Sequence, residues 1–141
     1  MRFWDSSAIV PLLVHESSFE NLRQLLLSDA EMTVWWGTVV ECTSALARRE
    51  REGLLALEMA NRAYDRLREL SATWAEMVPS NPIRITAQRL LRTHPLRAAD
   101  SLQLAAAIVA SEGDPPSLQF VTLDHQLAEA AHREGFEVIA Y

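Results

Sequence analysis

Hydrophobic residues along the chain alternate between short runs and longer stretches with helical spacing. The short runs RFW, MTVWW, EMV, QFVTL and FEVIAY are rich in aromatic and β-branched residues and predict β-strands. The longer stretches predict helices over roughly 7–14, 17–28, 38–52, 54–73, 84–93, 99–111 and 124–134. Strands separated by helices need crossover connections, which predicts a mostly parallel sheet covered on both faces. The expected fold class is therefore α/β.

The breaks between these segments are short and local. None, including those at 79–82 and 113–116, resembles an interdomain linker, so residues 1–141 are expected to form a single domain. The longest apolar runs are too short to cross a bilayer. The start MRFWDSS also has an acid where a signal peptide needs an apolar core. We therefore expect a cytoplasmic protein.

Composition excludes several function classes. All thirteen basic residues are arginine, and without lysine neither P-loop phosphate binding nor Schiff-base chemistry is available. The single cysteine, Cys42, permits no intrachain disulfide and no cysteine zinc site. A net charge of −6 argues against a basic nucleic-acid coat protein. It is compatible with a nuclease, because a divalent cation reverses the local charge of a carboxylate cluster.

Four acids, Asp5, Glu41, Asp100 and Asp124, lie next to or inside the most apolar segments. Burying several unpaired carboxylates together is costly, which indicates a positive ion between them. Asp5 and Asp124 follow predicted strands, and Glu41 and Asp100 fall in first helical turns. In a parallel sheet these positions open on one edge, so the four acids are expected to converge. Oxygen ligands favour Mg²⁺ or Mn²⁺ over zinc or copper.

Each acid also has a purely structural explanation. Asp5, Asp100 and Asp124 can cap the helices that follow them. Thr38 to Glu41 matches a capping box, in which Glu41 reaches back to the Thr38 amide. Asp100 is expected to be packed tightly among alanines and leucines, where an unpaired charge is costly. Singly these patterns decide little, and their combination favours a metal site.

The motifs together resemble the PIN domain, and specifically the VapC-type ribonuclease toxins of bacterial toxin–antitoxin pairs. DSSAIV, Thr38 with Glu41, LRAADSLQLAAA, and FVTLD followed by LAEAAHREGFEV occur in the family's order over essentially the whole chain. The resemblance implies a three-layer α/β/α sandwich with a short, mostly parallel sheet. It also implies that Asp5, Glu41, Asp100 and Asp124 bind Mg²⁺ or Mn²⁺. Family members commonly form homodimers and are silenced by a cognate antitoxin, here a VapB-like protein.

The resulting prediction is a metal-dependent endoribonuclease. The same four acids would be catalytic, holding one or two ions over an RNA phosphate for in-line attack by water. Arg97, Ser6 and Thr122 are the candidates for substrate contact, and the small hydroxyls can also orient carboxylates. Three tryptophans, Trp4, Trp35 and Trp36, are expected in core or sheet-edge packing rather than as platforms for RNA bases.

Two rival classes remain open at this point. A haloacid-dehalogenase-like phosphatase also starts with an aspartate after its first strand. It needs a second aspartate two residues later, where this chain has Ser7, and usually a lysine. The second rival is a PIN-fold protein-binding module without nuclease activity, and a metal-dependent RNase assay separates it from an enzyme.

Overall fold

A computed structural model describes residues 1–141 as a five-stranded parallel sheet with the strand order β3-β2-β1-β4-β5. The strands are β1 (Arg2–Trp4), β2 (Met32–Trp35), β3 (Ala75–Met77), β4 (Gln119–Val121) and β5 (Glu137–Ile139). Each neighbouring pair is parallel, with Phe3 in register with Thr33 on one side and with Phe120 on the other. The predicted α/β class is therefore confirmed.

Seven α-helices cover the sheet, and all of them lie where the apolar spacing placed them. They are α1 (Ser6–Val14), α2 (Phe19–Ser28), α3 (Thr38–Arg51), α4 (Leu57–Ser71), α5 (Asn81–Thr93), α6 (Ala98–Ala110) and α7 (His125–Arg133). The fourth helix begins three residues later than predicted, because residues 52–56 form the turn between α3 and α4. None of the helices combines the length and apolar composition that a membrane span requires.

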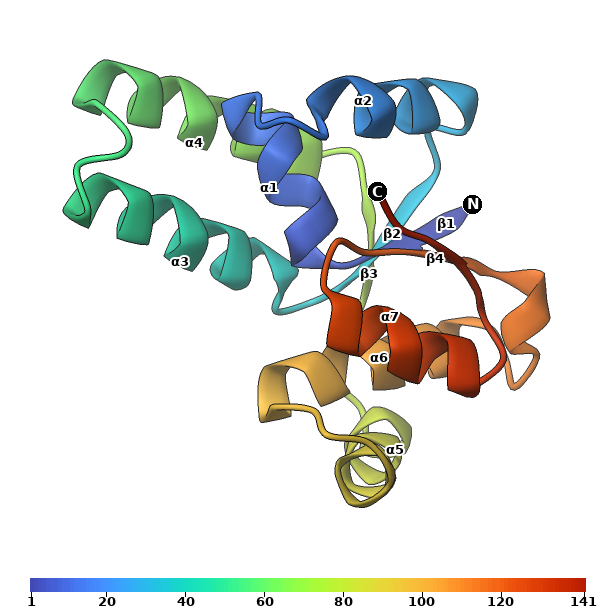
Figure 1. Cartoon of the computed structure of the whole chain (residues 1–141). Helices are drawn as coiled ribbons and strands as arrows, with labels where there is room; N and C mark the ends of the chain where they lie inside the picture. Colours follow the sequence, from blue (N-terminus) through green and yellow to red (C-terminus); the bar gives the residue numbers. More distant parts are fainter.

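Two hydrophobic cores lie on opposite faces of the sheet. One packs residues of α1 to α4 against Trp4 and Val121, and the other packs α5, α6 and α7 against Phe3 and Phe120. Neighbouring strand residues point to opposite faces, so each inner strand supplies both cores. Figure 1 shows α1 and α2 on one side of the sheet and α5, α6 and α7 on the other, which confirms the three-layer arrangement.

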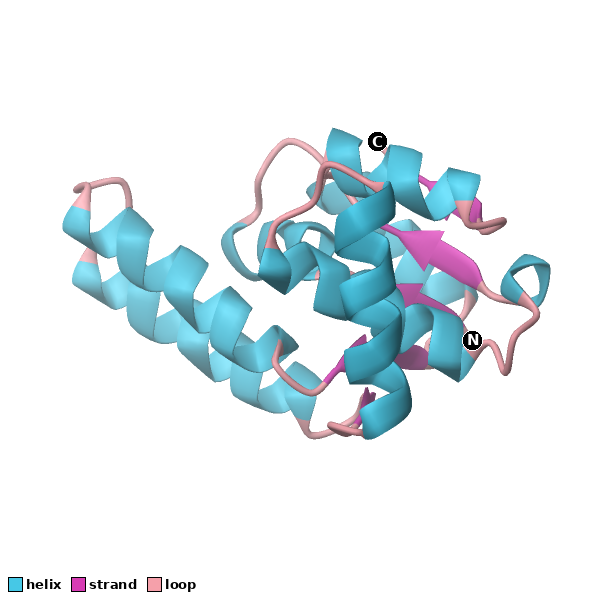
Figure 2. Ribbon diagram, turned by 90° about the horizontal axis from the view of Figure 1, so that it is seen from below, coloured by secondary structure: helices cyan, strands magenta, loops and turns pink.

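Helices α3 and α4 form an antiparallel pair that extends away from the sheet in both views (Figures 1 and 2). The buried residues of α4, Ala60, Ala63 and Leu67, recur at helical spacing and belong to the core shared with α1 and α3. Because α3 starts directly after β2, its first turn lies at the carboxyl edge of the sheet.

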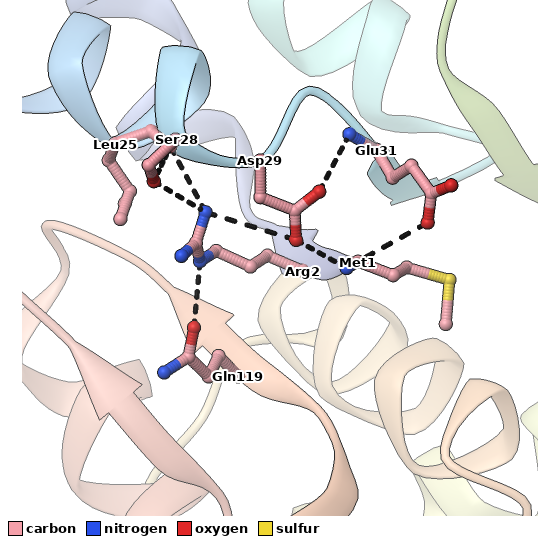
Figure 3. Close-up of polar contacts among 7 residues, drawn as sticks. All are labelled: Met1, Arg2, Leu25, Ser28, Asp29, Glu31 and Gln119. Carbon is pink, nitrogen blue, oxygen red and sulfur yellow. Dashed lines mark hydrogen bonds and ion pairs between the residues drawn. The ribbon is translucent and has the colours of Figure 1, made fainter.

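At the amino edge of the sheet, Arg2 joins two strands to α2 (Figure 3). Its Nε donates to Gln119 Oε1 in β4 at 2.7 Å, and its Nη1 donates to the carbonyl of Leu25 at 3.0 Å and to Ser28 Oγ at 3.2 Å. This side chain therefore fixes the position of α2 against β1 and β4, at the edge opposite to the predicted acids.

Candidate active site at the carboxyl edge of the sheet

All four predicted acids line one open pocket of about 690 Å³ at the carboxyl ends of β1 and β4. They come from the starts of α1, α3, α6 and α7, which are far apart in the sequence. The rest of the wall is mostly polar, and includes Glu16, Ser6, Ser7, Ser44, Arg48, Arg49, Arg97 and Gln126. The convergence that the parallel topology predicts is therefore present in the structure.

Asp5 is the most deeply buried of the four, with 3% of its surface exposed. Its Oδ2 accepts hydrogen bonds from the Ser7 amide at 3.3 Å, from Ser7 Oγ, and from Thr122 Oγ1 at 2.9 Å. Its Oδ1 has only a long contact with Ser6 Oγ at 3.4 Å. Burial raises the pKa of Asp5 above its ordinary value despite these donors. One oxygen is held firmly and the other remains available.

Glu41 lies in the first turn of α3 and accepts a hydrogen bond from Gln103 Nε2 at 2.7 Å. The expected capping box is wrong: the N-cap is Gly37, and Thr38 is the first helical residue with its hydroxyl bonded to Gln103. Gln103 is fully buried. Burial raises the pKa of Glu41 to about 7, with smaller contributions from the charges of Asp5 and Asp100.

Gln103 is a site residue that sequence analysis missed. The signal was a single amide inside the apolar stretch SLQLAAA, on the helix that carries Asp100. A buried amide needs partners, and a glutamate on a neighbouring helix is a good one. Its partner could not be named because Glu41 lies 62 positions away.

Asp100 and Asp124 are partly exposed, as Glu41 is. Asp100 is partly exposed, and Ala98 and Ala99 beside it are exposed, so the tight packing expected around it is wrong. Its pKa is raised, first by burial and then by the charge of Asp124. Asp124 caps α7, with Oδ1 accepting from the Leu127 amide at 2.9 Å, and its other oxygen has no partner in the protein.

The donor set fits a hard divalent cation by its chemistry. The pocket offers carboxylate oxygens and no histidine or cysteine, and the nearby Cys42 is buried with its pKa raised to about 12 by burial. However, no group of three or more His, Cys, Asp or Glu side chains in residues 1–141 is close enough together to hold an ion. The acids thus share a pocket without forming a ready-made ligand cluster.

The predicted substrate-contact residues lie in two different places. Arg97 and Ser6 line the pocket. Thr122 is fully buried behind Asp5, to which it donates, and lies outside the pocket wall. Its position is that of a residue that orients a carboxylate.

Three arginines line the acid pocket. Arg48 and Arg97 are exposed and form no ion pair, whereas Arg49 pairs with Glu16. The exposed pair therefore has guanidinium groups free to meet an anion near the acids.

The fold and this pocket define a class: an α/β protein in which carboxylates from four elements meet at the carboxyl edge of a parallel sheet. No protein-family model matches the chain. Two curated relatives from Mycobacterium tuberculosis are ribonuclease VapC45 of strain CDC 1551 / Oshkosh and ribonuclease VapC49 of strain ATCC 25618 / H37Rv. Each is 28% identical to this chain, over 96% of it and 92% of the relative.

Two solved structures share the fold. A toxin–antitoxin complex from Klebsiella pneumoniae aligns with a TM-score of 0.66 and 15% identity, over 99% of this chain and 96% of that one. PAE2754 from Pyrobaculum aerophilum aligns with a TM-score of 0.68 and 19% identity, over 99% and 87% of the two chains. The two ribonuclease relatives and these structures together confirm the resemblance to VapC-type proteins that the motifs indicated.

Proposed function

We propose that this chain is a metal-dependent endoribonuclease, the toxin of a VapBC-type toxin–antitoxin pair, acting within a single domain of residues 1–141. The observation that carries the proposal is the meeting of Asp5, Glu41, Asp100 and Asp124 in one pocket. Acids that lie together without positive partners disfavour one another's charged form, and such groups are concentrated at functional sites. The names of the two ribonuclease relatives support the choice of RNA as substrate.

The four acids are the residues proposed to hold Mg²⁺ or Mn²⁺. Each offers at least one carboxylate oxygen that short protein hydrogen bonds do not occupy. Such an ion supplies a water of lowered pKa and offsets charge on the scissile phosphate. Asp5 and Asp100 are proposed as the principal ligands. Asp124 is proposed as a second-site or water-mediated ligand, and Glu41 as a ligand or as the group that orients the attacking water.

The surrounding polar residues hold these acids in place. Ser7 and Thr122 donate to the same oxygen of Asp5, which fixes the rotation of its carboxylate. Gln103 fixes Glu41 in the same way from α6. Ligand precision of this kind normally depends on such outer hydrogen bonds. At the rim, Arg97 and Ser6 are proposed to contact the phosphates next to the cleaved bond.

Two partners belong to the proposal. The first is a cognate VapB-like antitoxin that covers the pocket, and the second is another copy of this chain in a homodimer. The fold shared with the Klebsiella pneumoniae toxin–antitoxin complex supports the antitoxin. Homodimer formation follows from the motif resemblance alone.

Asp5→Asn and Asp100→Asn test the function directly. Each variant keeps the side-chain shape and, at position 5, the capping ability, so the fold should be retained. We expect cleavage of a mixed pool of transfer and ribosomal RNA in Mg²⁺ to fall at least about a thousandfold, or about 4 kcal/mol in activation free energy. EDTA should abolish cleavage by the unaltered protein.

The matched control is Asp29→Asn, which neutralises an acid at the opposite edge of the sheet and should cleave normally. Full activity of the Asp5 and Asp100 variants would refute the site. If the unaltered protein does not cleave RNA in any divalent metal, the chain is the protein-binding module described above.

A further inference from the structure

A second cavity of about 320 Å³ opens at the carboxyl ends of β2 and β3, on the same edge of the sheet as the acid pocket. Its lining includes Trp35, Ser80, Asn81, Arg84 and Leu102. The acid pocket lies at the carboxyl end of β1, and β2, which ends at the lining residue Trp35, is the neighbouring strand. A chain that binds across the acids can therefore continue into this second cavity. We refer to it as the flanking cavity.

Trp36 directly follows Trp35, which lines the flanking cavity, and 53% of its surface is exposed, contrary to the packing position expected for it. Its ring meets Trp35 edge to face, with centroids 6.5 Å apart, and its amide donates to the Met77 carbonyl at 3.0 Å. The backbone of Trp36 is thus tied to β3 while much of the indole faces solvent. The exposed part of the indole is therefore held in place and is open to a ligand.

The position of the Trp35 ring requires a glycine at position 37. A Cβ at position 37 would lie 2.6 Å from Trp35 Nε1, which is too close for any real side chain. The turn therefore accepts only glycine while Trp35 lines the flanking cavity. Trp35 Nε1 makes no hydrogen bond in the protein and is not among the buried atoms without a partner, so this donor can serve a ligand.

The charge of the flanking cavity is the reverse of that of the acid pocket. No carboxylate lines it, and Arg84 is exposed and forms no ion pair. Asn81 adds an exposed amide. An exposed indole, a free guanidinium and an amide together are the groups that bind unpaired nucleotides: the ring stacks on a base and the arginine contacts a phosphate.

We propose that Trp36 and the flanking cavity bind an unpaired RNA nucleotide next to the cleaved bond, with Trp36 stacked on its base and Arg84 on its phosphate. This rests on the proposed ribonuclease function and adds to it a subsite that requires the substrate to be single-stranded there. Because every base has an aromatic face, the subsite contributes affinity with little sequence preference.

Binding of labelled oligoadenylate and oligouridylate, measured by fluorescence anisotropy in Mg²⁺, tests the subsite. An Asp5→Asn background prevents cleavage during the measurement. On this background Trp36→Ala should weaken binding of both RNAs by about 5- to 150-fold, the range for one stacked base. Trp36→Phe should restore most of the affinity. Arg84→Ala should lower the dependence of log affinity on log salt concentration by about one unit.

The matched control is Leu57→Ala, which removes another exposed apolar side chain, at the far end of the α3–α4 pair. It should leave affinity unchanged. An oligomer of ribose phosphates without bases separates stacking from shape, because it should bind equally well to proteins with and without the Trp36→Ala substitution. Light scattering on the same samples reports the oligomeric state.

Equal affinity of the Trp36→Ala variant for normal RNA would overturn the subsite. So would a fall in affinity that accompanies loss of a dimer, because the exposed ring would then cover a second copy of the chain. In both cases cleavage by the unaltered protein in Mg²⁺ leaves the proposed function standing. If the unaltered protein neither binds nor cleaves RNA, the proposed function and the subsite fall together.

Discussion

At the amino edge of the sheet the carboxylate of Asp29 lies against the guanidinium of Arg2 and the amino group of Met1, whereas none of the four acids proposed as ligands at the carboxyl edge has an ion-pair partner. The hydrogen bond from the Met1 amino group is the main reason that the pKa of Asp29 is lowered (Figure 3). The pKa values of Asp5, Glu41 and Asp100 are all raised, chiefly by burial.

The difference separates acids that stabilise the fold from acids that the fold merely tolerates. At the amino edge, positive groups are supplied by the chain and the charge joins α2 to the sheet. At the carboxyl edge the chain supplies hydroxyl and amide donors instead, such as Thr122 and Gln103, which orient a carboxylate without neutralising it. A missing positive charge of this kind is what a bound cation would provide.

The largest expected effect on stability comes from removing the hydrogen bonds of Arg2 at the amino edge of the sheet. Arg2→Met removes three hydrogen bonds from a side chain that is 15% exposed and leaves Gln119 and the Leu25 carbonyl without their donor. We expect the free energy of unfolding, measured in urea, to fall by about 2–3 kcal/mol. Cleavage per folded molecule should not change, because the acids lie at the other edge.

The control for that variant is Arg62→Met, which removes an exposed pair with Glu58 on α4. It should cost less than about 0.5 kcal/mol. If Arg2→Met lowered the free energy of unfolding as little as Arg62→Met does, the polar contacts at the amino edge would not stabilise the fold in the way described.

A smaller effect is expected from adding metal. Magnesium at ten times its dissociation constant should stabilise the unaltered protein by about 1.4 kcal/mol, since it binds only the folded state. For a domain of this size that is a rise of about 3–6 °C in the melting temperature. Asp29→Asn should retain the rise and Asp100→Asn should lose it. An equal rise in both variants would place the ion outside the acid pocket.

The sequence was sufficient for the layout of the site because that layout follows from periodicity. Strand and helix spacing located every element to within a few residues, and the rule that parallel strands share a carboxyl edge brought Asp5 and Asp124 together. Neither step requires knowing which side chains touch.

Contacts between distant segments could not be predicted. Glu41 bonds to Gln103 rather than to the Thr38 amide, because α6 brings a buried amide to it and Gly37 takes the capping position. Trp36 shows a second limit. The run MTVWW is apolar throughout, yet β2 ends at Trp35 and only that indole has a core to enter. Where a strand stops inside an apolar run is decided by the neighbouring elements.

The finest test of the comparison concerns the sign of the pH dependence. In the fold the pKa of Glu41 is raised from 4.5 to about 7, so the folded protein binds this proton more tightly than the unfolded chain does. The stability contributed by protonation is therefore fully present below about pH 4.5 and is lost as the pH rises through about 7. In EDTA, the contribution of Glu41 should therefore make the unaltered protein less stable as the pH rises over that range.

Glu41→Gln cannot ionise and keeps an oxygen that accepts from Gln103. In EDTA it should be more stable than the unaltered protein at pH 8, because the variant has no charge to bury. The gain should be only about 1 kcal/mol, since solvent in the open pocket screens the charge of Glu41. The gain should shrink as the pH falls to 5, and urea unfolding at several pH values measures it. Glu58→Gln, at an exposed position on α4, should show no such trend. A gain that stays constant with pH would mean that Glu41 is ordinary and that the two edges of the sheet do not differ in the way described.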